Sequence, residues 1–161
     1  MIHALLLIAL SSLGAAPADA EIAERYLSAL YSQDLETLAT LSHEEMVFRD
    51  DTATFLGNGA WRYEGRKAVV EFFAASLETV SSARFEKVRS FTSGEQTVLE
   101  LDYIAGGDGA AFGAPGVHLE MRVSGVTVIT VRNSKVVEHH DFIDYPSMMR
   151  QIEEQKAAAR P

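Results

Sequence analysis

Two residues in the first third of the chain have side chains suited to proton transfer. Tyr26 lies on the apolar face of a helix predicted over residues 22–30. Asp50 lies in an alternating segment, residues 46–51, and is the last residue on the face that it shares with Phe48. Apolar surroundings disfavour the charged form of a carboxyl group and make its anion a better base, and a phenol can donate a hydrogen bond to a developing enolate. The pattern predicts acid–base chemistry in a mostly apolar pocket.

Both residues also have a structural interpretation. Tyr26 could be an ordinary core tyrosine. Asp50 could be a strand-end residue that forms an ion pair with Arg49 or Arg62. The catalytic interpretation therefore requires that Tyr26 and Asp50 face one cavity, within reach of the same substrate atom.

Asp141 is the next candidate, on a last strand predicted over residues 136–143. This strand pairs with a long strand, residues 117–131, and the length of the turn sets the register. A two-residue turn places Val126 opposite Asp141, whereas a three-residue turn places Thr127 there. Only the second register brings Asp141 to the apolar face of the long strand.

The three-residue register also places Ile129 opposite His139. It puts His139 and Asp141 on the same face as Met121 and Thr127, so we predict that these residues line the pocket. The alternative is that Asp141 is a solvent-facing charge.

Two further acids, Glu100 and Asp102, lie on a strand predicted over residues 97–104. Composition favours a core face made by Leu99 and Leu101, with both acids in water. The opposite orientation would place Glu100 in the pocket wall and make Asp102 a partner of the catalytic carboxylates.

The pocket walls are predicted from aromatic residues. Trp61, the only tryptophan, lies on a loop over residues 55–65 that borders the pocket mouth, and it could instead be a core or interface residue. Phe72 belongs to the apolar stripe of the clearest predicted helix, residues 65–80.

No metal site and no cofactor are predicted. His139 and His140 are adjacent on a strand and point to opposite faces, and His118 with Glu120 is a single pair. The glycine-rich residues 106–109 join two strands instead of opening a helix, so they do not match a dinucleotide-binding motif. The absence of cysteine excludes disulfides, thiol catalysis and thiolate ligands.

The elements that position these residues follow an α+β order. Two helices and a strand come first, then a loop and a third helix, then a run of hairpin-connected strands and a final helix. We interpret residues 105–116, rich in Gly and Ala, as a loose hairpin loop, and residues from about 154 as a polar tail. A bent, antiparallel-rich sheet wrapped around about three helices would form a cone with an open end.

The first twenty residues resemble a secretory signal peptide that is cleaved after Ala20. The apolar run at residues 4–10 is too short to span a bilayer, and a buried or frayed helix is the alternative. Residues 21–161 then form a single domain, exported to the periplasm or the medium. The formal net charge of −9 argues against nucleic acid or an anionic membrane as a partner, and no later segment suits a membrane span.

The chain resembles the nuclear-transport-factor-2-like superfamily, which includes ketosteroid isomerases, SnoaL-like cyclases and limonene-epoxide hydrolases. The resemblance rests on three stretches, RYLSALYSQDLETLATLSHEEMVFRDD, GRKAVVEFF and KVVEHHDFIDYP, and on the order of elements. It implies a cone-shaped fold with a pocket, and functions that range from isomerases to pure binding modules.

The resemblance also implies site residues. Tyr26 matches the oxyanion-donor tyrosine of the ketosteroid isomerases and Asp50 their general base, whereas Thr127 stands where they have a second, acidic donor. An acidic residue often occurs in this superfamily at the position of Asp141. Asp102 matches an aspartate of the epoxide hydrolases, whose arginine is replaced here by Glu100.

The sequence therefore predicts a pocket for a small apolar or amphipathic molecule. The first hypothesis is a cofactor-independent isomerase or hydrolase, and the second is a non-catalytic binding or dimerisation module of the same fold. Both faces of the predicted sheet carry apolar residues, so a homodimer is expected.

Overall fold

The structure, a computed structural model, describes residues 17–57 and 59–159. Its helices are α1 (Pro17–Tyr31), α2 (Leu35–Leu41), α3 (Arg66–Leu77) and α4 (Tyr145–Ala158), with short 3-10 helices η1 (Thr52–Leu56) and η2 (Ala110–Phe112). Its strands are β1 (Ser42–Asp50), β2 (Trp61–Glu64), β3 (Val80–Ser93), β4 (Gln96–Gly109), β5 (Ala114–Arg132) and β6 (Lys135–Ile143).

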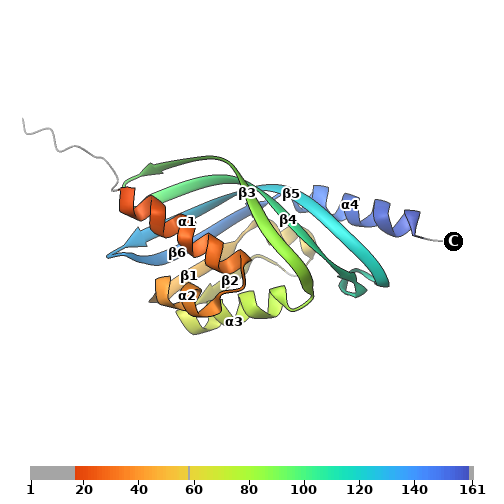
Figure 1. The fold of residues 1–161 in the computed structure, drawn as a ribbon, viewed down its shortest axis with the longest axis horizontal. Coiled ribbons are helices and arrows are strands. Elements are labelled where there is room, and N and C mark those ends of the chain that lie inside the picture. The colour runs from red at the N-terminus through yellow and green to blue at the C-terminus, as the bar shows by residue number, and fades with distance from the viewer. Residues whose placement is uncertain (1–16, 58, 160–161) are drawn as a thin grey trace, which may run out of the picture.

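The six strands form one sheet in the order β2-β1-β6-β5-β4-β3. Neighbouring strands are antiparallel except β1 and β6, which pair in parallel. The sheet curves around α1, α2 and α3, while α4 extends from the opposite end of the molecule (Figure 1). The predicted α+β cone is confirmed.

The core lies between the three helices and the inner face of the sheet. Tyr26 and Leu27 of α1, Met46 of β1, and Leu99 and Leu101 of β4 are fully buried in it. The inner face of β4 therefore carries Leu99 and Leu101, as composition favoured. Because alternate residues of a strand point to opposite sides, this arrangement sends Glu100 and Asp102 to the outer face.

Side chains at the helix starts explain two of the helix boundaries. Asp34 accepts a hydrogen bond from the backbone N–H of Thr37 at 3.0 Å, as expected of the N-cap of α2. Asp144 accepts one from the backbone N–H of Ser147 at 2.9 Å and caps α4 in the same way. α4 therefore starts at Tyr145, two residues after the end of β6, and the hydroxyl of Tyr145 reaches Asp50 at the end of β1.

The last hairpin has the register that places Thr127 opposite Asp141 and Ile129 opposite His139. Its turn, however, contains two residues, Asn133 and Ser134, both with positive φ. A β-bulge between this turn and the site shifts the pairing by one residue, because Val131 pairs with Val136 but Thr130 pairs with Glu138. The register predicted for a three-residue turn thus arises from a two-residue turn and a bulge.

The prediction of a loose loop over residues 105–116 is wrong. Strand β4 continues to Gly109, and β5 begins already at Ala114. A Cβ atom on Gly107 would lie 2.4 Å from the backbone oxygen of Thr79, so glycine is needed there for the close approach of β3.

Helix α4 covers an edge of the sheet that β6 leaves open. Gln151 accepts from the N–H of Arg122 and donates to its carbonyl at 3.0 and 2.8 Å, and Gln155 does the same with Glu120 at 2.9 and 2.7 Å. The segment predicted as a polar tail from about residue 154 is therefore helical as far as Ala158.

The apolar run of residues 4–10 lies outside the described residues, and the predicted cleavage point after Ala20 falls within α1. In the described part of the chain, every helix is too short or too polar to cross a membrane.

Candidate functional site

A cavity of about 150 Å³ opens at the inner face of the sheet. It is lined by α1, α3, β1, β2, β6 and the first residue of α4. Most of its wall is aromatic or aliphatic, and Asp50 and Asp141 are the carboxylates among its lining residues. The lining residues are Leu30, Tyr31, Phe48, Asp50, Trp61, Phe72, Phe73, Ser76, Leu77, Asp141 and Tyr145.

Asp50 is the last residue of β1 and is 1% exposed. Its Oδ1 accepts hydrogen bonds from the backbone N–H groups of Thr52 and Ala53, at 2.8 and 3.1 Å, and from the hydroxyl of Thr52. Its Oδ2 accepts a hydrogen bond from the hydroxyl of Tyr145 at 2.7 Å. Neutral donors thus hold both oxygens of a buried carboxylate.

The predicted alternative, an ion pair of Asp50 with a neighbouring arginine, is not formed. Arg49 bonds Glu138 and Arg62 bonds Glu64, both at 2.8 Å and both away from the cavity. The alternation of β1 and β2 explains this, since it points Arg49 and Arg62 to the outer face when Asp50 points inward.

Asp50 and Asp141 are register partners on the parallel strands β1 and β6. Neighbouring strands lie about 4.8 Å apart, and paired residues of parallel strands point to the same side of the sheet. The two carboxylates therefore stand side by side, although 90 residues separate them in the sequence, from position 50 to position 141.

Buried hydrogen bonds on the side away from the cavity hold Asp141 in place. Its Oδ1 accepts from the hydroxyl of Thr127 and lies 2.9 Å from Nε2 of His139. Nδ1 of His139 lies 3.2 Å from the hydroxyl of Tyr26. With Nε2 protonated, His139 donates to Asp141 and accepts from Tyr26, so every member of this Tyr26–His139–Asp141 relay has a partner. Tyr103 in turn bonds the hydroxyl of Thr127.

The tyrosines near the two carboxylates are neutral hydrogen-bond donors at ordinary pH. Burial, and then the charge of Asp141, raises the pKa of Tyr26 well above its usual value. Burial also raises the pKa of Tyr145, and its hydrogen bond to Asp50 raises it further. The pKa of Tyr103 is raised by burial and by the charge of Asp141.

Several predicted site residues lie behind the cavity wall instead of on it. Tyr26, Thr127, Ile129 and His139 are at most 1% exposed and are absent from the cavity lining. Tyr26 therefore supports His139 and is not in a position to contact a ligand, which corrects its prediction as an oxyanion donor. Sequence spacing could place these residues on the inner face but could not tell the wall from the layer beneath it.

Glu100 and Asp102 face outward, as composition favoured, so the pocket roles considered for them are wrong, and so is the prediction that Met121 lines the pocket. Glu100 bonds Arg89, and Asp102 bonds Arg122 at 3.0 Å and Ser124 at 2.7 Å, all on the outer face of the sheet. The hydrogen bond from Ser124, followed by that from Arg122, lowers the pKa of Asp102, so it is an ionised surface acid. Met121 lines a separate hollow near α4.

Phe48, Trp61 and Phe72 line the cavity as expected. Tyr145 and Tyr31 also line the cavity but were not among the predicted site residues. Tyr145 is the first residue of α4 and comes four residues after Asp141. Its position just after the strand that carries a candidate acid is the sequence signal that could have identified it. Tyr31, the last residue of α1, carried no distinguishing pattern.

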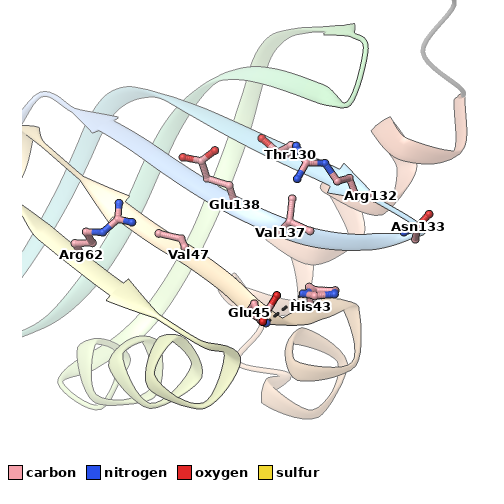
Figure 2. A pocket seen from close by; sticks show the side chains of 9 residues that line it. All are labelled: His43, Glu45, Val47, Arg62, Thr130, Arg132, Asn133, Val137 and Glu138. Carbon is pink, nitrogen blue, oxygen red and sulfur yellow. Dashed lines mark hydrogen bonds between the residues drawn. The ribbon is translucent and has the colours of Figure 1, made fainter.

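A larger hollow of about 390 Å³ lies on the other face of the sheet, near the turn between β5 and β6 (Figure 2). Its charged residues include Glu45, Arg62, Arg132 and Glu138. Three of these are engaged in ion pairs, Arg62 with Glu64, Arg132 with Glu95 and Glu138 with Arg49. The inner cavity, where two buried carboxylates meet aromatic walls, is the stronger candidate.

Across residues 17–57 and 59–159, no group of three His, Cys, Asp or Glu side chains is arranged to hold a metal ion. The polar residues that line the inner cavity are two aspartates, two tyrosines, Ser76 and Trp61. Carboxyl and phenol groups commonly serve in proton transfer and hydrogen bonding.

Residues 20–152 match the family model of the SnoaL-like polyketide cyclases. No curated relative matches the sequence. A SnoaL-like protein from Shewanella putrefaciens has a similar structure, with a TM-score of 0.78 and 27% identity, over 87% of this chain and 99% of that one.

More distant structures share the fold alone. An LEH-like epoxide hydrolase of M. tuberculosis aligns with a TM-score of 0.64 and 16% identity, over 88% of this chain and 93% of that one. TerC, which was crystallised with polyporic acid, aligns with a TM-score of 0.68 and 15% identity, over 84% of this chain and 98% of that one.

Proposed function

Because the chain belongs to the family of the SnoaL-like polyketide cyclases, we propose that it is a cofactor-independent acid–base enzyme acting on a small, largely apolar carbonyl compound. The observation that carries this proposal is the position of Asp141. Its carboxylate lines an aromatic cavity and rests on the buried relay of His139 and Tyr26.

Asp141 is the proton-transfer group in this proposal. It takes a proton from a carbon next to the substrate carbonyl, which leaves an enolate. Return of the proton to another carbon gives isomerisation. Attack of the enolate carbon on a second carbonyl of the substrate, whose oxygen then takes the proton, gives ring closure. His139, held by Tyr26, fixes the orientation of the carboxylate. Asp102 takes no part in this chemistry, since it faces outward.

The test combines a binding screen with proton exchange. Steroid enones, epoxides and polyketide-like lactones are screened for a rise in melting temperature, and compounds that bind are incubated in heavy water and followed by NMR. We expect deuterium to enter next to the carbonyl with the native protein. Asp141→Asn should still bind the same compound, but deuterium exchange should be at least about 100-fold slower, which is the usual loss when a general base is removed. Equal rates for the native protein and Asp141→Asn would refute the assignment.

A non-catalytic binding module is the second candidate, and one observation favours it. The oxygens of Asp50 already accept hydrogen bonds from Thr52, Ala53 and Tyr145, as expected of a structural carboxylate. In that case a compound would raise the melting temperature of the native protein, but neither deuterium exchange nor turnover would be detected. Asp141→Asn could then change only the affinity for the compound.

Export and dimer formation are also proposed. The signal-like composition of residues 1–20 supports cleavage after Ala20, which N-terminal sequencing of the protein from an expressing cell's exported fraction would test. The outer face of the sheet supports a homodimer, since Phe91 and Phe142 are 62% and 39% exposed there.

A further inference from the structure

The inner cavity combines aromatic walls with negative charge. Six of its eleven lining residues are aromatic, two are aspartates, and none is Arg, Lys or His. The ring of Trp61 lies 5.4 Å from that of Phe72 and 6.1 Å from that of Tyr145, both edge to face, so the walls enclose the space from more than one side.

The charge of Asp50 is not neutralised within the described protein. Its hydrogen-bond donors are the hydroxyls of Thr52 and Tyr145 and two backbone N–H groups, all of them neutral. The nearest arginines by sequence and register, Arg49 and Arg62, point to the outer face and pair with other acids.

The tyrosines near the cavity are affected by the negative charge of both aspartates. The charges of Asp50 and Asp141 add to burial in raising the pKa of Tyr145 and Tyr103. His139 bonds Asp141 from behind the wall and does not reach the cavity lining. An anionic ligand would therefore be repelled, while a cation would gain both a carboxylate and the faces of aromatic rings.

We propose that the ligand of this cavity carries a small organic cation, a methylated or otherwise apolar ammonium group, with Asp50 as its counter-charge and Trp61 and Phe72 as its aromatic contacts. A cavity of about 150 Å³ holds a group about the size of benzene, which suits such a head group. The inference rests on the proposed function only in taking the same cavity as the substrate site. There Asp141 transfers the proton and Asp50 holds the cation.

The test compares choline with its neutral isostere, in which carbon replaces the quaternary nitrogen. The two molecules have the same shape, so their difference in affinity measures the charge. Trp61 is the only tryptophan, and its indole N–H signal reports binding at this site alone. We expect choline to move that signal and to bind at least about tenfold more tightly than the isostere.

Variants locate the charge that is responsible. Asp50→Asn keeps the size of the side chain, and it should reduce choline affinity at least about tenfold while leaving the isostere unchanged. Asp102→Asn removes an acid from the outer face and serves as the matched control, with no expected change. The comparison of the two ligands on the native protein remains decisive if Asp50→Asn is unstable.

Three results would overturn the inference. They are equal affinity of choline and its isostere, no binding of choline at millimolar concentration, and binding of choline that leaves the Trp61 signal unmoved. The Asp141→Asn variant separates this inference from the proposed function, because it should slow proton exchange about 100-fold or more and still bind choline.

Discussion

Tyr26 and His139 are 113 residues apart in sequence, and their side chains meet at 3.2 Å beneath the candidate site. The rings of Phe48 and Phe73 pack against His139, with ring centroids 5.1 and 5.5 Å from that of the imidazole. The two imidazole nitrogens are therefore polar atoms in apolar surroundings. A buried imidazole with both nitrogens bonded has a single favoured orientation and tautomer. At the scale of the residue, the site therefore depends on groups that no ligand would contact.

The hydroxyl of Tyr26 is expected to contribute to stability. Tyr26→Phe leaves Nδ1 of His139 buried without a donor, and it should lower the free energy of unfolding by about 1–3 kcal/mol, as measured by urea denaturation. Tyr63→Phe is the control, because Tyr63 stacks on Phe72 at 4.2 Å and is partly exposed. Its cost should stay within about 0.5 kcal/mol. Equal costs for the two variants would contradict the relay.

His140 should make stability depend on pH. Burial, followed by the positive charge of Arg49, lowers the pKa of His140, against the smaller opposing effects of Asp51 and Glu138. Below about pH 6.5 the unfolded chain binds a proton that folded His140 resists, so stability falls as the pH falls. His140→Gln should lose less stability than the native protein between about pH 7.5 and 5.5, whereas His118→Gln, at an exposed site, should not. An identical loss in His140→Gln would argue against this origin.

At the scale of the element, strand β4 needs glycine where the start of its neighbour β3 comes close to it. Gly107→Ala would place a Cβ atom 2.4 Å from the backbone oxygen of Thr79, and backbone cannot rotate away as a side chain can. We expect a loss of about 1–3 kcal/mol in urea denaturation with an unchanged slope. Gly106→Ala is the control, since its nearest neighbour is the hydroxyl of Ser82 at 3.1 Å. A smaller loss for Gly107→Ala than for Gly106→Ala would refute the close-approach argument.

The whole molecule presents an outer sheet face with apolar residues on several strands. Phe91 pairs with Val98, and Phe142 pairs with Val126, which places these side chains opposite the core. If this face joins two copies, Phe142→Glu should convert a dimer to a monomer in size-exclusion chromatography with light scattering. Phe55→Glu, in η1 at a residue 54% exposed, should leave the mass unchanged. A monomeric native protein would end the dimer proposal.

Local pattern was enough to predict the fold. The apolar stripe of α3 and the alternation that includes Asp50 each depend on neighbours in sequence, and each is present in the structure. The same locality explains the error over residues 105–116, because glycine marks both turns and close contacts between strands. Only the packing of β3 against β4 distinguishes the two cases.

The sequence by itself determined the α+β order, the inward orientation of Asp50 and the choice of Asp141 as its possible companion. Tertiary structure decided the site. It paired β1 with β6 in parallel so that Asp50 and Asp141 stand side by side, placed Tyr26 behind the wall, turned Asp102 outward and brought Tyr145 to Asp50. The physical reason is that periodicity reveals which face of an element is buried, whereas a cavity forms where several elements meet, and its depth depends on their packing.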